Sequence, residues 1–396
     1  MSDQLEFVER KGIGHPDSVA DIIAEEMMLR YRRYVYSKIG IMPNGWFDKV
    51  VVSGGEAHVT FGHAEIIKKP KIILYGKAMK IDGNADYIYN LFSSAVEYVI
   101  DSIFGHGVFD NIEIEVAVNS GMGAEHAKGF YDLRTNSKLN PYFLKDVQKA
   151  NDTIITSGWW PLNVAEKSVI IIENYINSEY FKNLYPETGY DVKVVTTCIN
   201  SKYEFTICIP FIASITPTKI IYEKKKQQIV SLLQKYIYQE LLIDDFSINL
   251  NTKDDEHSAY LTVFGSAFDK GDVGVTGRGN RYPGVISIMR PSGVEAYAGK
   301  NTFNHSGKLY AFLATDLAKT IQEFSNQDTQ VIISTDNGIP IDEPKNIVII
   351  LNEVLADNSL FSNQINKSID RLKSLSSKLE HRDTIESFRS CHGFFK

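Results

Sequence analysis

The sequence predicts a mixed α/β protein that divides into two or three compact parts. Its 396 residues are too many for one ordinary hydrophobic core, and 43% of them are hydrophobic. Short apolar runs of strand length alternate with segments of helical periodicity in every third of the chain. No low-complexity linker separates the thirds, so we expect them to pack closely.

The first third begins with a helix directly after the run GIGH. Pro16 suits the first helical turn, apolar residues recur at helical spacing behind it, and Gly40 suits the helix end. The further elements expected in order are strands at 49–53 and 71–79 and a helix over 87–104. Glycine-containing residues 105–110 suggest a boundary, which predicts a domain over residues 1–110.

The other two thirds repeat this alternation without a direct sequence repeat. In the predicted domain 111–250 we expect strands 112–118, 189–195 and 204–210, helices 164–181 and 219–242, and a long functional loop over 120–144. In the predicted domain 251–396 we expect strands 259–265, 330–335 and 346–351, a helix over 309–324, and a polar, helix-compatible tail from 358. All boundaries are approximate, and segments of different domains can interleave.

Charge and composition exclude several classes of protein. The 49 acidic residues exceed the 42 basic ones, which argues against a broad nucleic-acid surface. No apolar run reaches the length of a membrane span, so we expect a cytoplasmic enzyme. Cys198, Cys208 and Cys391 show no C-x-x-C spacing, which supports neither a disulfide framework nor a zinc site.

The stretch 269–308 concentrates glycines and cations. Glycine allows tight turns and close approach to a ligand, while arginine and lysine match phosphate oxygens. A solvated loop or a nucleic-acid patch is the ordinary alternative, but the acidic chain favours a small polyanionic ligand. The stretch contains neither a Walker loop nor a dinucleotide fingerprint. The cations are Lys270, Arg278, Arg281, Arg290, Lys300 and Lys308.

Several ordered blocks resemble the S-adenosylmethionine synthetases, specifically the archaeal type of methionine adenosyltransferase. The blocks are ERKGIGHPDS at 9–18, GG at 54–55, ANDT at 150–153, DVKV at 191–194, the stretch 271–308, and GIPID at 338–342. Together they follow the family's order over most of the chain. The resemblance implies three similar α/β domains related by pseudo-threefold symmetry, in a homodimer with active sites at the subunit interface.

The resemblance also implies a reaction. Members of the family that the chain resembles are transferases of S-adenosylmethionine biosynthesis and one-carbon metabolism. In their reaction the sulfur of L-methionine attacks C5′ of ATP. The displaced tripolyphosphate is cleaved to pyrophosphate and phosphate. Mg²⁺ is the implied cofactor, whereas K⁺ stays open because Asn301 and Asn304 stand where other branches of the family have charged residues. Neither a nucleic acid nor a membrane is an expected partner.

The residues that match the family's motifs are expected to have the roles of their family counterparts. His15 is expected to donate to the oxygen that leaves, with Lys193 and Arg278 as further catalytic residues, and Asp17 and Asp272 are expected to bind the metal. The expected ATP- and phosphate-binding residues are Arg281, Lys300, Lys308 and Asp272, and the expected substrate-binding residues are Asp152, Glu56 and Glu9. Each also has an ordinary structural reading, for example a helix-capping histidine or an aspartate in a turn.

Three segments depart from the family pattern: MPNGWFD at 42–48, FGHA at 61–64 and IITSGWWP at 154–161. They concern the sulfur substrate more than ATP. Trp159 and Trp160 either reshape a pocket or pack in a core or interface. The alternatives to methionine adenosylation are therefore transfer to a modified thioether, hydrolysis of ATP or tripolyphosphate, and a nucleotide-binding regulatory role.

Overall fold

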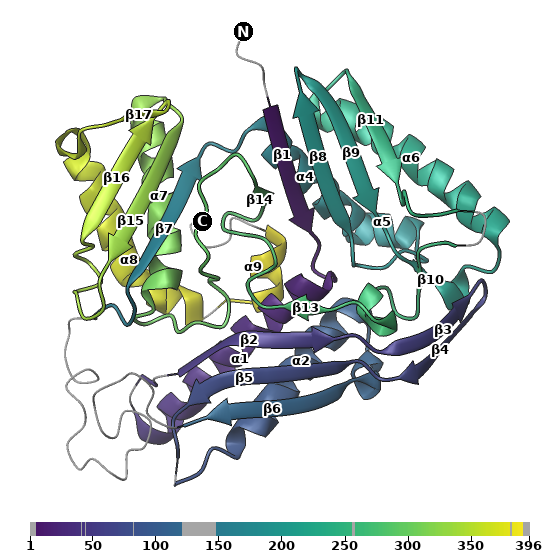
Figure 1. Cartoon of the computed structure of the whole chain (residues 1–396), viewed down its shortest axis with the longest axis horizontal. Helices are drawn as coiled ribbons and strands as arrows, with labels where there is room; N and C mark the ends of the chain where they lie inside the picture. The colour runs from purple at the N-terminus through teal and green to yellow at the C-terminus, as the bar shows by residue number, and fades with distance from the viewer. Residues whose placement is uncertain are drawn as a thin grey trace.

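The structure is a computed structural model that describes residues 5–40, 42–43, 45–81, 83–120, 148–255, 258–380 and 382–390. It confirms the mixed α/β class. Figure 1 shows three main sheets around a centre that contains α9 (Thr384–Ser390), with helices packed against each sheet. None of the helices in the described ranges is long and apolar enough to cross a membrane.

The N-terminal sheet has the strand order β13-β2-β5-β6 and packs against two long helices. Its elements are α1 (Pro16–Ile39), β2 (Gly45–Ser53), β5 (Lys71–Ala78), α2 (Tyr87–Phe104), β6 (Glu113–Asn119) and β13 (Gly274–Val275). Pro16 at the start of α1 and the left-handed Gly40 at its end confirm the predicted helix limits.

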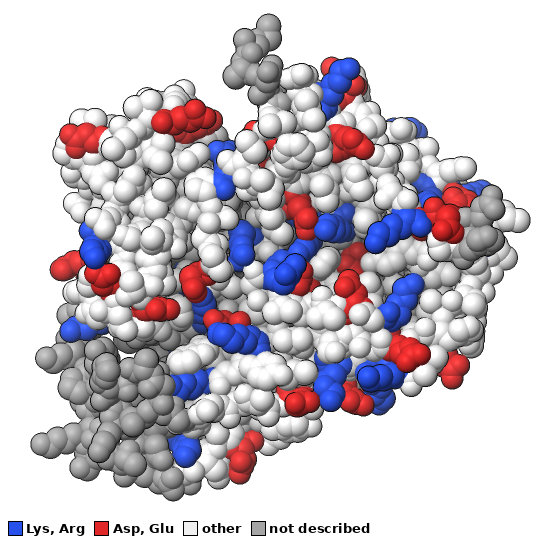
Figure 2. Space-filling model, in the orientation of Figure 1, with Lys and Arg blue, Asp and Glu red and all other residues white. Residues whose placement is uncertain are grey.

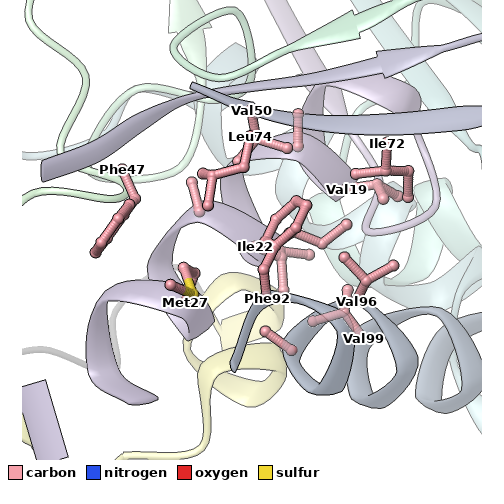
Figure 3. Close-up of a cluster of buried hydrophobic side chains, with 14 of the residues drawn as sticks. Val19, Ile22, Met27, Phe47, Val50, Ile72, Leu74, Phe92, Val96 and Val99 are labelled. Atoms are coloured by element: carbon pink, nitrogen blue, oxygen red, sulfur yellow. The ribbon is translucent and has the colours of Figure 1, made fainter. Parts of the chain in front are cut away.

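Apolar side chains of α1 and α2 meet those of β2 and β5 in a core (Figure 3). Ile22, Val50 and Phe92 are completely buried there. Burial of one such side chain contributes about 1.5–3 kcal/mol, so this core holds α1 firmly on the sheet. The rigid helix is important because its N-terminus carries the candidate site.

The central sheet has the strand order β11-β9-β8-β1-β14. Its elements are β1 (Leu5–Lys11), α4 (Val164–Ile176), α5 (Glu179–Leu184), β8 (Lys193–Ile199), β9 (Lys202–Cys208), α6 (Lys219–Leu241), β11 (Phe246–Leu250) and β14 (Ile286–Ser287). Antiparallel pairing of β1 with β8 places Lys11 opposite Lys193. Cys198 is buried in this core, whereas Cys208 is half-buried and Cys391 lies outside the described residues.

The C-terminal sheet has the strand order β17-β16-β15-β7. Its elements are β7 (Ile154–Trp160), α7 (Ser306–Ser325), β15 (Thr329–Thr335), β16 (Asn346–Leu351), β17 (Val354–Leu355) and α8 (Ser362–Glu380). Trp159 is only 2% exposed and packs in the hydrophobic core between the central sheet and its helices. The guanidinium carbon of Arg290 lies 6.0 Å from its ring centre. This indole therefore has the packing role rather than the pocket role.

Shorter elements complete the fold. They are the hairpin β3 (Glu56–Thr60) and β4 (His63–Lys68), the parallel pair β10 (Phe211–Ile212) and β12 (Leu261–Thr262), and the 3-10 helices Val108–Asn111, Ala213–Ile215, Ala267–Lys270 and Asn358–Phe361. The sequence patterns did not indicate β1, β7 or the β3–β4 hairpin. The functional loop expected at 120–144 lies outside the described residues except for its first residue.

The three sheets interleave along the sequence. β1 belongs to the central sheet, β7 to the C-terminal sheet, and β13 to the N-terminal sheet, far from their sequence neighbours. The domain boundaries near residues 110 and 250 stay a prediction. The interleaving has a direct consequence for the site, because it joins segments from opposite ends of the chain.

Two expected strands are corrected by the structure. The strand expected at 189–195 begins only at Lys193, because the backbone of Gly189 lies against Gly265. A Cβ on Gly189 would lie 2.3 Å from the Cα of Gly265. Residues 189–192 therefore cross another chain segment instead of joining the sheet.

The second correction concerns the strand expected at 259–265, which is reduced to the two residues of β12. The carboxylate of Asp269 accepts hydrogen bonds from the backbone N–H groups of Val263 and Phe264, at 2.6 and 3.0 Å. In a continuing strand, such backbone N–H groups would be available to pair with a neighbouring strand. The side chain therefore turns the chain out of the sheet.

Candidate active site

The site begins where β1 ends and α1 starts. The N–H of Gly12 donates to the carbonyl of Val192 at 2.6 Å, and that of Gly14 donates to the carbonyl of Tyr190 at 3.1 Å. A Cβ on Gly14 would lie 2.5 Å from the carbonyl carbon of Tyr190, so only glycine permits this approach. The contact places His15 beside the start of β8.

His15 caps α1 with its ring. Its Nδ1 accepts the backbone N–H of Asp17 at 3.1 Å, which assigns the proton of the neutral ring to Nε2. Burial and the charge of Lys11 lower the pKa of His15 to about 3, so the ring is neutral at physiological pH. His15 lines the large cavity described below. It is therefore an N–H donor that can act without losing or gaining a proton.

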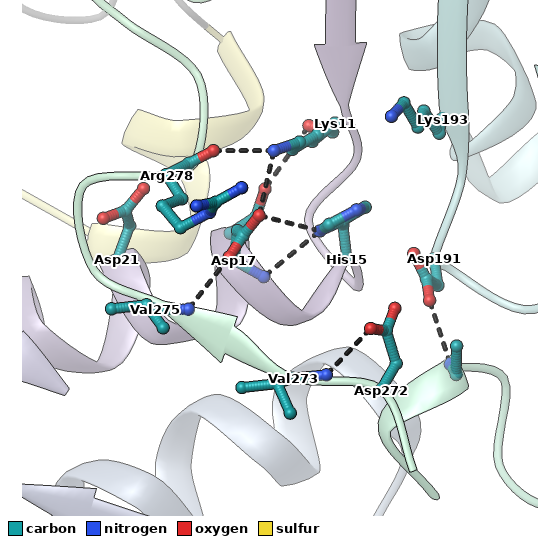
Figure 4. A network of polar contacts seen from close by, with 12 residues as sticks. Lys11, His15, Asp17, Asp21, Asp191, Lys193, Asp272, Val273, Val275 and Arg278 are labelled. Atoms are coloured by element: carbon teal, nitrogen blue, oxygen red, sulfur yellow. Dashed lines mark hydrogen bonds and ion pairs between the residues drawn. The ribbon is translucent and has the colours of Figure 1, made fainter. Parts of the chain in front are cut away.

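Lys11 and Asp17 form a buried ion pair beside His15 (Figure 4). Lys11 Nζ lies 2.9 Å from Asp17 Oδ2 and donates to the carbonyl of Arg278 at 2.7 Å. The other oxygen, Asp17 Oδ1, accepts the N–H of Val275 at 2.9 Å. This pair joins the end of β1, the start of α1 and the glycine-rich segment around β13.

The glycine-rich segment lies directly on α1. A Cβ on Gly274 would lie 2.0 Å from the carbonyl oxygen of Pro16, so the close contact requires glycine. Asp21, also on α1, accepts the N–H of Gly277 at 2.7 Å, and burial raises the pKa of its carboxyl to about 7. The segment is thus fixed by α1, and it carries Asp272 and Arg278.

Asp272 and Arg278 are both exposed, in contrast to the residues beneath them. Asp272 Oδ1 accepts the N–H of Val273 at 2.8 Å. Figure 4 shows the guanidinium of Arg278 beside Lys11 and Asp17, and Asp272 nearer to Asp191. The predicted metal ligand therefore lines the cavity described below, whereas the predicted catalytic arginine lies beside the Lys11–Asp17 pair.

Glu9 links the cations of two neighbouring strands. Its Oε1 lies 3.2 Å from Lys193 Nζ and 3.6 Å from Lys11 Nζ. The Lys193 side chain remains 35% exposed. Glu9, expected to bind substrate, here orients two lysines, and Lys193 keeps a face that a ligand can reach.

A cavity of about 760 Å³ extends from this cluster toward β9 and β12. Its lining includes His15, Asp191, Lys193, Cys208, Asn251, Lys253, Tyr260, Lys270 and Asp272. Cations and carboxylates are mixed around it, and Figure 2 likewise shows both signs across the centre of this face. A volume of this size suits a nucleotide-sized ligand.

Asp191 forms the buried wall of the cavity. It accepts hydrogen bonds from the Ala267 N–H at 2.9 Å and from the Tyr260 and Ser266 hydroxyls, each at 3.2 Å. Complete burial raises the pKa of this carboxyl to about 7 despite the three donors. Asp191 thus positions Tyr260 and the loop that leads to Asp272.

A second charged cluster lies around the middle of α1. Lys308 is fully buried, with Nζ 2.6 Å from Glu25 Oε2, and it donates to the Lys300 carbonyl at 3.0 Å. Lys300 pairs with Glu295 and lies 4.0 Å from Asp48. Glu25 is ten residues beyond His15, roughly 15 Å along the helix axis. The structure does not bring these two lysines into the cavity cluster.

The remaining predicted residues lie elsewhere. Asp152 is exposed and accepts the N–H of Thr153 at 2.8 Å, and Glu56 is exposed at the start of β3. Arg281 is half-buried, and its N–H donates to the Val285 carbonyl at 3.2 Å. In the described part of the chain these three residues do not line the large cavity.

The two predicted metal ligands differ in how well they fit a divalent ion. Asp272 is exposed at the cavity, and Mg²⁺ is commonly held by one carboxylate together with substrate phosphates and water. Asp17 carries an ammonium on one oxygen and an N–H on the other. Within the described residues, the side chains assemble no group of three or more metal-binding types. Asp272 fits, whereas Asp17 as arranged does not.

Several residues of the site were not identified from the sequence. Lys11, Asp191 and Tyr260 had no assigned role, and Asn280 holds Lys11 in place by accepting its N–H and donating to its carbonyl, at 2.9 and 2.7 Å. Lys11 and Asp191 do lie inside blocks that resemble the family, which was the available signal. Lys11 contacts Asn280 and Arg278 more than 260 residues away, and Asp191 contacts Tyr260, Ser266 and Ala267 about 70 residues away, so no local pattern reveals them.

Comparison with known proteins identifies the family. A profile of S-adenosylmethionine synthetase (AdoMet synthetase) matches residues 1–385. The chain belongs to this family. The S-adenosylmethionine synthases of Caldivirga maquilingensis and Saccharolobus solfataricus are 35% and 34% identical to it. The alignments cover 88% and 95% of this chain, and 86% and 93% of those proteins. The expected family is thereby confirmed, and with it the class of enzyme.

Two further proteins are similar to this chain, one in sequence and one in structure. An uncharacterized protein of Streptococcus pyogenes serotype M1 is 32% identical over 87% of this chain and 85% of its own length. The solved structure of an unusual S-adenosylmethionine synthetase from Campylobacter jejuni matches with a TM-score of 0.58 at 16% identity, covering 98% of this chain and 99% of that one. The structural match supports the fold alone, because its sequence identity is low.

Proposed function

We propose that the chain transfers the adenosyl group of ATP to the sulfur of L-methionine and then cleaves the displaced tripolyphosphate. The sulfur attacks C5′, the bond from C5′ to the triphosphate oxygen breaks, and its electron pair leaves with the triphosphate. Water then divides tripolyphosphate into pyrophosphate and phosphate. A thioether needs no deprotonation, so the first step requires positioning and charge stabilisation rather than a general base.

The neutral His15 ring carries this proposal. Its Nδ1 is engaged by the Asp17 N–H, so Nε2 is the donor, and the residue lines the cavity together with Lys193 and Asp272. Such a donor suits the developing negative charge on the leaving oxygen. Lys193 and Arg278 add positive charge for the phosphates. Mg²⁺ at Asp272 would neutralise and orient the same oxygens when bound.

Three of the other predicted residues are accessible to a site completed by a second copy of the chain. Asp152 and Glu56 are exposed and Arg281 is half-buried, all outside the cavity cluster, and family resemblance implies sites at a dimer interface. Lys300 and Lys308, in contrast, are buried against carboxylates of the same chain. Exposed apolar side chains favour such an interface. Val273 next to Asp272 is 51% exposed, and Val294 in the same glycine-rich stretch is 90% exposed.

A second cavity bears on the choice of sulfur substrate. Ile154 and Ile155 from the divergent 154–161 segment line a second cavity of about 540 Å³ beside Glu295. Bulky isoleucines at this position would change the shape available to a thioether. A modified thioether is therefore the second candidate substrate, with the same transfer chemistry.

Mass spectrometry of the products tests the proposal. Purified chain is incubated with ATP, Mg²⁺ and L-methionine, beside a methionine-free control and a panel of larger thioethers. We expect S-adenosylmethionine, pyrophosphate and phosphate. A sulfonium product formed only from a larger thioether would support the second substrate. Phosphate release without a sulfonium product would instead indicate a hydrolase, and nucleotide binding without turnover would indicate a regulatory protein.

A further inference from the structure

Lys11 is held at both ends, through its backbone groups and through its ammonium. Asn280 binds both backbone groups of this residue, at 2.9 and 2.7 Å. At the other end, Nζ donates to Asp17 Oδ2 at 2.9 Å and to the Arg278 carbonyl at 2.7 Å. The side chain is only 10% exposed. This ammonium is thus a built part of the site rather than a mobile surface charge.

Both carboxylate oxygens of Asp17 also have hydrogen-bond partners. Oδ2 binds Lys11, Oδ1 accepts the Val275 N–H, and the side chain is 7% exposed. A divalent ion at a normal bond length of about 2.1 Å from Oδ2 would lie within about 5 Å of the ammonium. The two cations would repel each other in a poorly hydrated environment. Binding of the ion would therefore require Lys11 to leave a carboxylate that it already neutralises.

We infer that Lys11 is the resident cation of Asp17, and that a divalent ion in this cavity is held by Asp272 and the ligand phosphates without Asp17. Asp17 then has a positioning role. It couples Lys11 to the backbone of Val275 and so fixes the segment that carries Asp272 and Arg278. This inference rests on the proposed function only for the identity of the phosphate ligand.

Mn²⁺ binding without nucleotide tests the inference directly. Free and bound Mn²⁺ are separated by electron paramagnetic resonance during titration of the full chain and its variants. Lys11→Met should bind one more Mn²⁺ per subunit than the wild-type chain, because Asp17 becomes available. The double variant Lys11→Met/Asp17→Asn should lose the extra ion. Asp17→Asn alone should leave the wild-type number unchanged.

Lys193→Met is the matched control, since it removes the lysine opposite Lys11 on the neighbouring strand, which pairs with Glu9 rather than with Asp17. It should not create a Mn²⁺ site, which separates the specific effect from a general loss of positive charge. An equal number of ions on the wild type and Lys11→Met would overturn the inference. Loss of an ion from Asp17→Asn would overturn it too, and that arm decides the question if Lys11→Met does not fold.

A separate titration with the ATP analogue AMP-PNP distinguishes this inference from the proposed function. Failure of the wild-type chain to bind the analogue would count against an ATP site. It would leave the nucleotide-free Mn²⁺ counts intact, and those counts alone decide the role of Lys11.

Discussion

Two charged clusters lie along α1 and use lysine in opposite ways. At the N-terminal end, Lys193 keeps a 35% exposed side chain and is 3.2 Å from Glu9. Near the middle of the helix, Lys308 is completely buried and 2.6 Å from Glu25. The same family resemblance predicted Lys193 as a catalytic residue and Lys308 as a phosphate ligand. The difference shows that burial, rather than residue type or motif, decides whether a lysine is available to a ligand in this chain.

The largest expected effect follows from breaking the buried Lys308–Glu25 ion pair. Lys308→Met would leave the Glu25 carboxylate buried without a counterion, so the free energy of unfolding should fall by about 3–5 kcal/mol. Urea denaturation of both proteins measures this. Lys193→Met is the control and should cost less than about 1 kcal/mol, because its ion pair is partly exposed. Equal losses in the two variants would remove the distinction between the clusters.

The next effect concerns His15, the neutral N–H donor of the cluster at the N-terminal end of α1. Asparagine can still cap α1, but its shorter side chain should not reach the leaving oxygen, so His15→Asn should keep its thermal stability. Its turnover number should fall by about 10²–10³-fold, as for the loss of one preorganised donor. Rates of S-adenosylmethionine formation measure this. Wild-type turnover in a folded His15→Asn variant would assign the ring a capping role only.

A smaller effect concerns pH and the buried wall of the cavity. Burial raises the folded-state pKa of Asp191 from 3.8 to about 7. Between these two values the folded chain binds more protons than the unfolded chain, so stability falls as pH rises, and it levels off above pH 7. Each pH unit removes up to about 1.4 kcal/mol.

Urea denaturation at pH 5 and pH 8 measures the dependence. Asp191→Asn removes the titrating group, so the wild-type chain should lose about 2–3 kcal/mol more than the variant between these two pH values. Asp21 and Asp269 also have raised pKa values, but they contribute equally to both proteins. The same pH dependence in both would show that Asp191 is not protonated in the folded chain near neutral pH.

The smallest expected effect concerns the partly exposed Lys193. Lys193→Met should lower kcat/KM for ATP by about tenfold, because it removes one partly solvated charge from the phosphates, and added salt should reduce the difference. Steady-state kinetics at two ionic strengths measures both. Lys71→Met, which removes a surface lysine paired with Glu115 at 3.2 Å, should leave kcat/KM unchanged. A similar loss in both variants would indicate a general effect of net charge.

Local patterns predicted the long elements well. The helix from Pro16 to Gly40 and the helix over 87–104 were identified because apolar periodicity and terminal residues agree within one segment. The strands 330–335 and 346–351 were identified because each is a short apolar run between breakers. Predictions failed where a distant residue decides the local conformation, as at Gly189 against Gly265 and at residues 259–265 around Asp269.

The sequence by itself determined the fold class, the family and the segments that carry the site, because these depend on composition, periodicity and ordered motifs. Only the tertiary structure decided that β1 joins the central sheet, that Lys11 neutralises Asp17, and that Lys308 is sealed against Glu25. Lys308 and Glu25 are 283 residues apart, and the pairing arises only when the first turn of α7 meets the middle of α1. The physical reason is that the availability of a charge depends on burial and on its nearest opposite charge, and both are properties of packing between distant segments.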